Sequence, residues 1–225
     1  MDYLSFSLEP ENPYDLQYFV VHTGNAEAYN LLSLAVNDLL AQEDIIKRFF
    51  SCFFICGGKG SGKTHLCHGF IDRLIKSGFD KKRAVVFKLT PAALAKAGCQ
   101  SSKQEEEIPL LVAEYERLKR SGGLLIVHTE SDLEQVTSNP HLKSRLLAGH
   151  VCVLNYPKTE ELEPVIKSLA AKKNLALSDK SVKLIVENLP LDTASFGEIL
   201  DNLNSVALAK GKKVSGKLLR KIIKT

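Results

Sequence analysis

The chain has 225 residues, of which 44% are hydrophobic and 25% are charged, and its net charge is +4. This composition is ordinary for a globular protein, and the length allows one full core with a smaller second domain. No apolar run approaches the ~18 residues that cross a bilayer, and no secretory signal opens the chain, which predicts a cytoplasmic protein without a membrane segment. The five cysteines include no C-x-x-C pair and indicate reduced, buried thiols.

Strand and helix patterns alternate through the first two thirds of the chain. Residues 1–15 are rich in Pro, Glu and Asn and are typical of an extended segment. The apolar run Phe49–Cys56 ends in glycine and predicts a strand buried on both faces. Further strands are predicted at 84–89, 124–127 and 151–154. Helices are predicted at 25–40, 62–77 and 105–120, and a short helix is predicted to begin at Thr90.

Beyond Pro157 only helical patterns occur, at 159–173, 179–187, 196–209 and 215–224. Strands that alternate with helices predict an α/β fold: a mostly parallel sheet with helices on both faces, followed here by a small helical domain. The predicted organisation is an extended peptide at 1–15, an α/β domain at 16–157 and a helical domain at 158–225.

A phosphate-binding loop is predicted between the first strand and its helix. Its residues fit the pattern G-x-x-x-x-G-K-[ST] and are Gly57, Gly58, Lys59, Gly60, Ser61, Gly62, Lys63 and Thr64, with His65 directly after them. Glycines let successive backbone N–H groups converge on phosphate oxygens, and the helix N-terminus adds partial positive charge. Lys63 is expected to neutralise the β- and γ-phosphates, and the hydroxyl of Thr64 to hold Mg²⁺.

Histidines and cysteines near this loop raise the alternative of a metal site. His65, Cys67 and His68 follow the loop, and Cys52 and Cys56 precede it. Their spacing matches no tetrahedral zinc pattern, and they fall on different faces of a helix and a strand. The sequence therefore favours nucleotide over metal binding here.

Three segments in order resemble the DnaA replication-initiator family of AAA+ ATPases. They are the stretch Tyr14–Asn25, the loop segment GGKGSGKTHL and the box Leu142–Gly149, and the resemblance spans about residues 12–225. It implies a P-loop AAA+ core with a C-terminal helical lid, and ADP or ATP as ligand. The family's base-contacting stretch corresponds to Phe19, Val20, Val21 and Asn25.

Two further roles follow from the same resemblance. Arg145 stands where the family places an arginine finger, which acts in trans on the nucleotide of a neighbouring subunit. Thr129 stands at the sensor-1 position. The resemblance also implies possible self-association through the AAA+ interface.

Both ends of the chain differ from the initiator. No helix-turn-helix pattern follows the lid, so we expect DNA contact to be only indirect. Residues 3–8 are similar to the sliding-clamp peptide of the short Hda-type regulators in this family, although Tyr3 replaces the glutamine. The partner-binding candidates are Leu4, Ser5, Phe6 and Leu8. The implied partners are the DnaA initiator, whose ATP hydrolysis such regulators promote, and the DNA polymerase sliding clamp.

The acid that a P-loop ATPase needs at a strand end is not found. The second strand ends in Lys88-Leu89-Thr90, and the third is followed by His128, Thr129 and Glu130. An alternative places the acid at Glu114 within Leu110–Glu114, but the helical periodicity there argues against it. Ala194 falls at the family's sensor-2 arginine position.

These losses predict nucleotide binding with weak or absent hydrolysis, and hence an Hda-like regulator. An autonomous NTPase of the helicase-loader type and a nucleotide-locked scaffold without finger activity remain alternatives. Between Lys210 and Thr225 lie seven basic residues and no acidic one. Such a segment fits nucleic acid or an acidic partner, but the cationic face of a last helix is the favoured interpretation.

Overall fold

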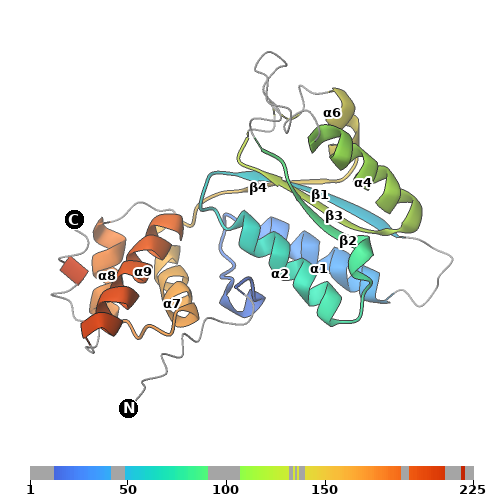
Figure 1. Cartoon of the computed structure of the whole chain (residues 1–225). Helices are drawn as coiled ribbons and strands as arrows, with labels where there is room; N and C mark the ends of the chain where they lie inside the picture. The colour runs from blue at the N-terminus through green and yellow to red at the C-terminus, as the bar shows by residue number, and fades with distance from the viewer. Residues whose placement is uncertain are drawn as a thin grey trace. The chain divides into compact units, whose positions relative to one another are not determined.

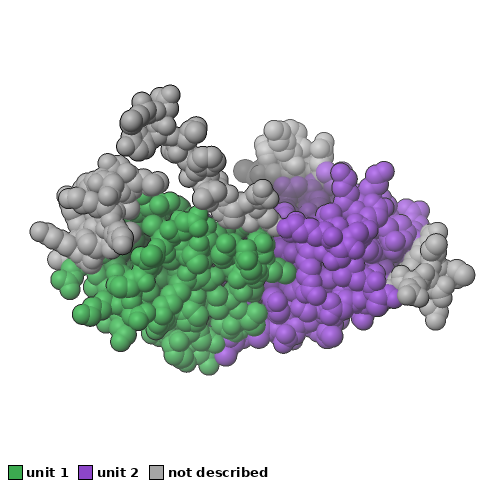
Figure 2. All heavy atoms as spheres, turned by 90° about the horizontal axis from the view of Figure 1, so that it is seen from below, with its two compact units in different colours: residues 1–22, 157–225 green, residues 23–156 purple. Residues whose placement is uncertain are grey.

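The computed structural model describes residues 13–41, 49–90, 107–131, 134, 136, 140–188, 193–210 and 219–220. Within these ranges, the side chains of residues 141, 193–194 and 206–210 are outside the description. The contacts divide the chain into unit 1, residues 1–22 with 157–225, and unit 2, residues 23–156 (Figure 2). The chain therefore passes between the units after His22 and after Tyr156. Among the described residues no helix is long and apolar enough to cross a membrane.

Unit 2 is built on a parallel sheet. Its described strands are β1 (Phe50–Gly57), β2 (Ala84–Lys88), β3 (Gly123–Thr129) and β4 (His150–Leu154), in the order β2-β3-β1-β4. Cys56 of β1 lies opposite Thr129 of β3, and Gly57 lies opposite Leu154 of β4. Parallel pairing brings the carboxyl ends of all four strands to one edge of the sheet.

Helices cover both faces of this sheet (Figure 1). On one face lie α1 (Ala26–Ala41) and α2 (Lys63–Lys76), which contact each other through the rings of Tyr29 and Phe70. On the other face lie α4 (Glu107–Ser121) and α6 (Pro140–Leu146). The residues of β1 from Ser51 to Cys56 are all buried, because the strand is central and covered on both sides.

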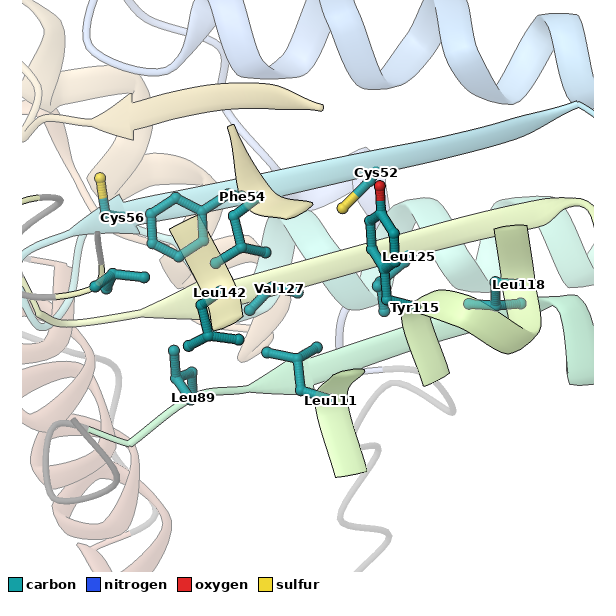
Figure 3. Close-up of a cluster of buried hydrophobic side chains, with 12 residues drawn as sticks. Cys52, Phe54, Cys56, Leu89, Leu111, Tyr115, Leu118, Leu125, Val127 and Leu142 are labelled. Carbon is teal, nitrogen blue, oxygen red and sulfur yellow. The ribbon is translucent and has the colours of Figure 1, made fainter. Parts of the chain in front are cut away.

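The core beneath α4 and α6 is shown in Figure 3. Side chains from β1 and β3 there meet the apolar stripe of α4. The members include Cys52, Phe54, Leu111, Tyr115, Leu118, Leu125, Val127 and Leu142. Cys52, Cys56, Cys67 and Cys152 are buried free thiols, as the composition predicted; Cys99 lies outside the described residues. Burial raises the pKa of the Cys52 thiol to about 12, which keeps it uncharged.

Unit 1 is helical in its described part. It contains η1 (Leu16–Tyr18), η3 (Thr159–Glu161), α7 (Leu162–Lys172), α8 (Asp179–Asn188) and α9 (Thr193–Lys210). The helices enclose a second core, which includes Leu162, Ile166, Val182, Ile185, Phe196, Leu200 and Leu203. The Ser168 hydroxyl donates to the Tyr18 carbonyl at 2.8 Å, which fixes the N-terminal segment to α7.

The predicted elements within the described residues are confirmed in kind and nearly in extent. The exceptions are short. The helix α6 and the 3₁₀ turns η1 and η2 (Lys81–Arg83) have no counterpart in the prediction. The helix expected after Thr90 lies outside the described residues, as does most of the one expected at 215–224.

Candidate functional site

The loop between β1 and α2 has the backbone geometry that the glycine pattern predicted. Gly60 and Gly62 have φ angles of 78° and 89°, in the left-handed region that favours glycine. Gly62 is the N-cap of α2 and offers no side chain to the first N–H groups of the helix. The N-terminus of α2 has no side-chain cap and follows the end of β1, which suits it to bind an anion.

Lys63, the first residue of α2, is buried, with 5% of its surface exposed. Its ammonium donates to the carbonyls of Gly57 at 2.8 Å and Gly58 at 2.7 Å. The Ser61 hydroxyl lies 3.4 Å away. Burial lowers the pKa of Lys63, and the nearby Glu130 carboxylate acts in the opposite direction. The loop thus holds a desolvated cation whose charge a phosphate would stabilise.

The other loop residues differ in their exposure. Thr64 is exposed in the first turn of α2, next to Lys63, and His65 is half-buried. The Lys59 side chain is exposed. No group of three His, Cys, Asp or Glu able to hold a metal occurs among the described residues.

At the carboxyl end of β2 the side chains are Lys88 and Thr90 rather than an acid. Lys88 lies opposite His128 of β3, and its positive charge lowers the pKa of both Lys63 and His128. Thr90 is bound to Glu107 at the start of α4: its hydroxyl lies 3.0 Å and its N–H 3.2 Å from the carboxylate. Sequence reasoning missed Glu107, because only the packing of α4 brings it to β2.

The alternative acid at Glu114 is wrong, because residues 110–114 form part of α4 rather than a strand. Glu114 forms an ion pair with Arg117 at 2.7 Å on the same helix. Of the acids near the loop, Glu130 directly follows β3 and is exposed. Among the described residues, the end of β2 itself carries no acidic side chain, and the carboxylate found there is that of Glu107, which reaches Thr90 from α4.

The end of β3 lies beside the end of β1 and is buried. Thr129 is buried and its hydroxyl oxygen accepts from the Ser131 N–H at 3.1 Å. Burial lowers the pKa of the neighbouring His128 to about 4, and the charges of His68, Lys63 and Lys88 act in the same direction. His128 is therefore neutral at neutral pH. Thr129 lies opposite Cys56 of the strand that leads into the loop, and its sensor-1 role stays a prediction.

Arg145 lies near the end of α6 and is paired within the chain. Its Nε donates to Oε1 of Glu116 at 3.0 Å, and a terminal nitrogen lies 3.0 Å from the same oxygen. The arginine side chain is 29% exposed and the glutamate side chain 42%. The guanidinium is therefore paired with Glu116 and partly exposed to solvent.

The remaining candidates are divided between the units or lie outside the described residues. Phe19, Val20 and Val21 follow η1 in unit 1, whereas Asn25 is buried in unit 2 just before α1. The clamp-peptide candidates Leu4, Ser5, Phe6 and Leu8 are outside the described residues. Ala194 lies in the first turn of α9, but its side chain is not described.

Comparison with known proteins identifies the fold. No family model matches the chain. A curated relative, an uncharacterized protein of Haemophilus influenzae, is 25% identical over 189 residues, covering 76% of this chain and 80% of that protein. Domain III of the Thermotoga maritima replication initiation protein DnaA is similar with a TM-score of 0.72 and 18% identity, covering 95% of this chain and 97% of that one. The chain has the AAA+ fold.

Two further solved structures agree. The RuvB Holliday junction branch migration motor of Thermotoga maritima matches with a TM-score of 0.63 and 16% identity, covering 94% of this chain and 72% of that one. AMPPCP-bound DnaA of Aquifex aeolicus matches with a TM-score of 0.58 and 19% identity, covering 89% and 67%. The predicted fold class, a parallel sheet with helices on both faces and a helical C-terminal unit, is confirmed.

Proposed function

We propose that this chain binds ADP or ATP through the loop Gly57–Thr64 and acts in the cytoplasm as a regulator of replication initiation. The observation that carries the binding is the buried Lys63 ammonium, held by two loop carbonyls at an uncapped helix N-terminus. Backbone N–H groups and one desolvated lysine are the elements that recognise phosphate. The AMPPCP bound to the similar DnaA supports an adenine nucleotide as the ligand.

The residues at the strand ends support the proposal that the chain itself hydrolyses nucleotide only weakly. Hydrolysis requires a carboxylate that orients the attacking water, and β2 presents Lys88 and Thr90 instead. Mg²⁺, when bound with nucleotide, would screen phosphate charge, and Thr64 is the side chain placed to touch it. A site that binds nucleotide but does not place charges to stabilise the transition state holds its ligand without hydrolysing it efficiently.

The regulatory part of the proposal rests on Arg145. A finger arginine acts on the nucleotide of a neighbouring subunit, so it remains useful when its own site turns over slowly. Arg145 is partly exposed, which fits a side chain that reaches a partner once its ion pair with Glu116 opens. The proposed target of Arg145 is the ATP bound by the DnaA initiator. Residues 3–8 are proposed to bind the DNA polymerase sliding clamp. The competing proposal is that the same face mediates self-association of this chain.

The experiment measures ATP hydrolysis by a DnaA initiator on clamp-loaded DNA with and without this chain. Wild type is expected to accelerate hydrolysis, and Arg145→Ala to lose most of that acceleration, since such an arginine contributes ~10³–10⁵ in rate. Arg145→Lys should lose nearly as much, because an ammonium cannot donate two parallel hydrogen bonds. The matched control is Lys143→Ala, an exposed cation on the same helix.

Other outcomes identify the alternatives. Acceleration that survives Arg145→Ala contradicts the finger and leaves a nucleotide-bound scaffold. Rapid hydrolysis by the chain alone, without any initiator, favours an autonomous NTPase. Nucleotide titration of Arg145→Ala provides the internal check, because this side chain should not affect the affinity of its own loop.

A further inference from the structure

The segment that follows β4 runs alongside the phosphate loop. β4 pairs with β1 as far as Leu154, opposite Gly57, so the next two residues pass beside the start of the loop. The Asn155 N–H donates to the Gly24 carbonyl at 2.9 Å, which holds this segment from its other side. The Tyr156 hydroxyl then donates to the Lys59 carbonyl at 2.7 Å. All of these contacts lie within unit 2.

The Tyr156 ring also occupies the space above Gly58. A Cβ atom at residue 58 would lie 2.4 Å from the tyrosine oxygen and 3.0 Å from Cζ, which is too close for either to remain in place. The carbonyl of Gly58 meanwhile accepts from the Lys63 ammonium. The lysine and the tyrosine therefore hold successive residues of one loop, the lysine through Gly57 and Gly58 and the tyrosine through Lys59.

We propose that Tyr156 is a positioning residue of the phosphate site, which orients the loop backbone before nucleotide binds. The peptide group is planar and trans, so its C=O and N–H point in opposite directions. A hydrogen bond that fixes the Lys59 carbonyl therefore also fixes the direction of the Gly60 N–H, in the part of the loop that receives phosphate. This inference rests on the proposed nucleotide binding and adds a residue outside the G-x-x-x-x-G-K-[ST] pattern.

The direct test is Tyr156→Phe, which keeps the ring and removes only the hydroxyl. We expect its affinity for ADP to fall about five-fold, the usual effect of one hydrogen bond of this kind. Affinity for inorganic pyrophosphate, measured by competition, should fall by the same factor, because the effect acts on the phosphate cradle. The matched control Tyr115→Phe removes a hydroxyl from the core on the opposite face of the sheet and should change neither affinity.

A double-mutant cycle tests the contact with Gly58. Gly58→Ala should displace the tyrosine and lose about as much ADP affinity as Tyr156→Phe. In a Tyr156→Ala background the space is open, so adding Gly58→Ala should cost much less than it does in wild type, and the two changes should be strongly non-additive. Additive effects would show that the ring and the glycine act independently and would overturn the proposal.

The remaining outcomes are separable. If wild type binds neither ADP nor pyrophosphate, nucleotide binding itself is wrong. If wild type binds both and Tyr156→Phe binds both equally well, only the role of Tyr156 is wrong. A loss for ADP without a loss for pyrophosphate would mean that the tyrosine contacts the nucleoside, which also contradicts positioning of the loop.

Discussion

The carboxyl ends of β1 and β2 differ in how many of the groups needed for nucleotide hydrolysis they carry. The end of β1 leads into a loop with left-handed glycines, a buried lysine and an uncapped helix. The end of β2, two strands away, carries Lys88 and Thr90, with Glu107 bound to Thr90 from α4. The first region has the features that suit phosphate, whereas the described residues at the end of β2 itself include no acid that would activate water.

From this difference we expect nucleotide affinity and nucleotide turnover to depend on separate strands. Binding requires features that are local to one strand–loop–helix segment. Turnover requires charges on other strands to be placed for the transition state. A chain can therefore retain nucleotide affinity after losing turnover. A nucleotide that is bound but not hydrolysed stabilises the folded form that binds it.

The largest expected effect is the slow hydrolysis of ATP by the chain alone. Without an acid at the end of β2, we expect a rate below ~10⁻² s⁻¹, at least ~10²-fold under the ~1 s⁻¹ at the low end of ordinary enzymes. Single-turnover hydrolysis of labelled ATP measures this rate. Turnover near ~1 s⁻¹ that Glu130→Gln abolishes would identify Glu130 as the missing acid and would break the comparison.

The second effect concerns the end of β1 and its loop. Lys63→Ala removes the charge-assisted contact to phosphate and should weaken ADP binding about 100-fold, equivalent to about 3 kcal/mol. Calorimetric titration of ADP measures it. Lys59→Ala is the matched control, because its side chain is exposed, and it should change the affinity less than about 3-fold. Equal affinities for wild type and Lys63→Ala would contradict the phosphate site.

The sequence predicted the end of β1 and its loop well, because their determinants are local. The apolar run at Phe49–Cys56, the glycine spacing and the helix that follows lie within about thirty residues, and each matches a known backbone requirement. The strands and longer helices were equally accessible from periodicity. The helix α6, with seven residues, is too short to display a periodic pattern.

The features that the sequence did not predict depend on long-range contacts. The strand order β2-β3-β1-β4 decides that Lys88 lies opposite His128, and no local pattern encodes that order. Glu107 reaches Thr90 only through the packing of α4, and Arg145 meets Glu116 across 29 positions. Tyr156 and Lys59 are 97 positions apart, and neither residue type suggests their hydrogen bond.

The third prediction uses acid to test the end of β3. The pKa of His128 is lowered to about 4 by burial, assisted by electrostatic interactions with His68, Lys63 and Lys88, whereas an unfolded histidine titrates near 6.5. Between these values the unfolded chain binds a proton that the folded chain does not. The free energy of unfolding should therefore fall as the pH drops from about 6.5 toward 4.

Urea unfolding at pH 7 and pH 5 measures this dependence. The pKa values of His22 and His68 are also lowered, so the test is the difference between wild type and His128→Gln rather than the wild-type slope alone. His128→Gln should show a weaker loss at pH 5. His150→Gln, on the edge strand β4, is the control and should retain the wild-type dependence. An unchanged slope in His128→Gln would contradict the burial of a neutral imidazole.

The smallest effect concerns the ion pair between Arg145 and Glu116. Unlike the ends of β1 and β2, Arg145 is proposed to act on a nucleotide bound by another subunit. A partly exposed ion pair contributes about 0.2–1 kcal/mol, so the guanidinium must give up this amount before it reaches a partner's nucleotide. Glu116→Gln keeps the shape and removes the charge, and it should raise stimulation of the initiator about 1.4- to 5-fold at subsaturating concentration. Glu114→Gln, which releases Arg117 on the same helix, is the matched control and should have no such effect. The measurement is initiator ATP hydrolysis over a range of concentrations of each variant. If Glu116→Gln instead falls to the level of Arg145→Ala, the carboxylate orients the guanidinium for its partner rather than restraining it.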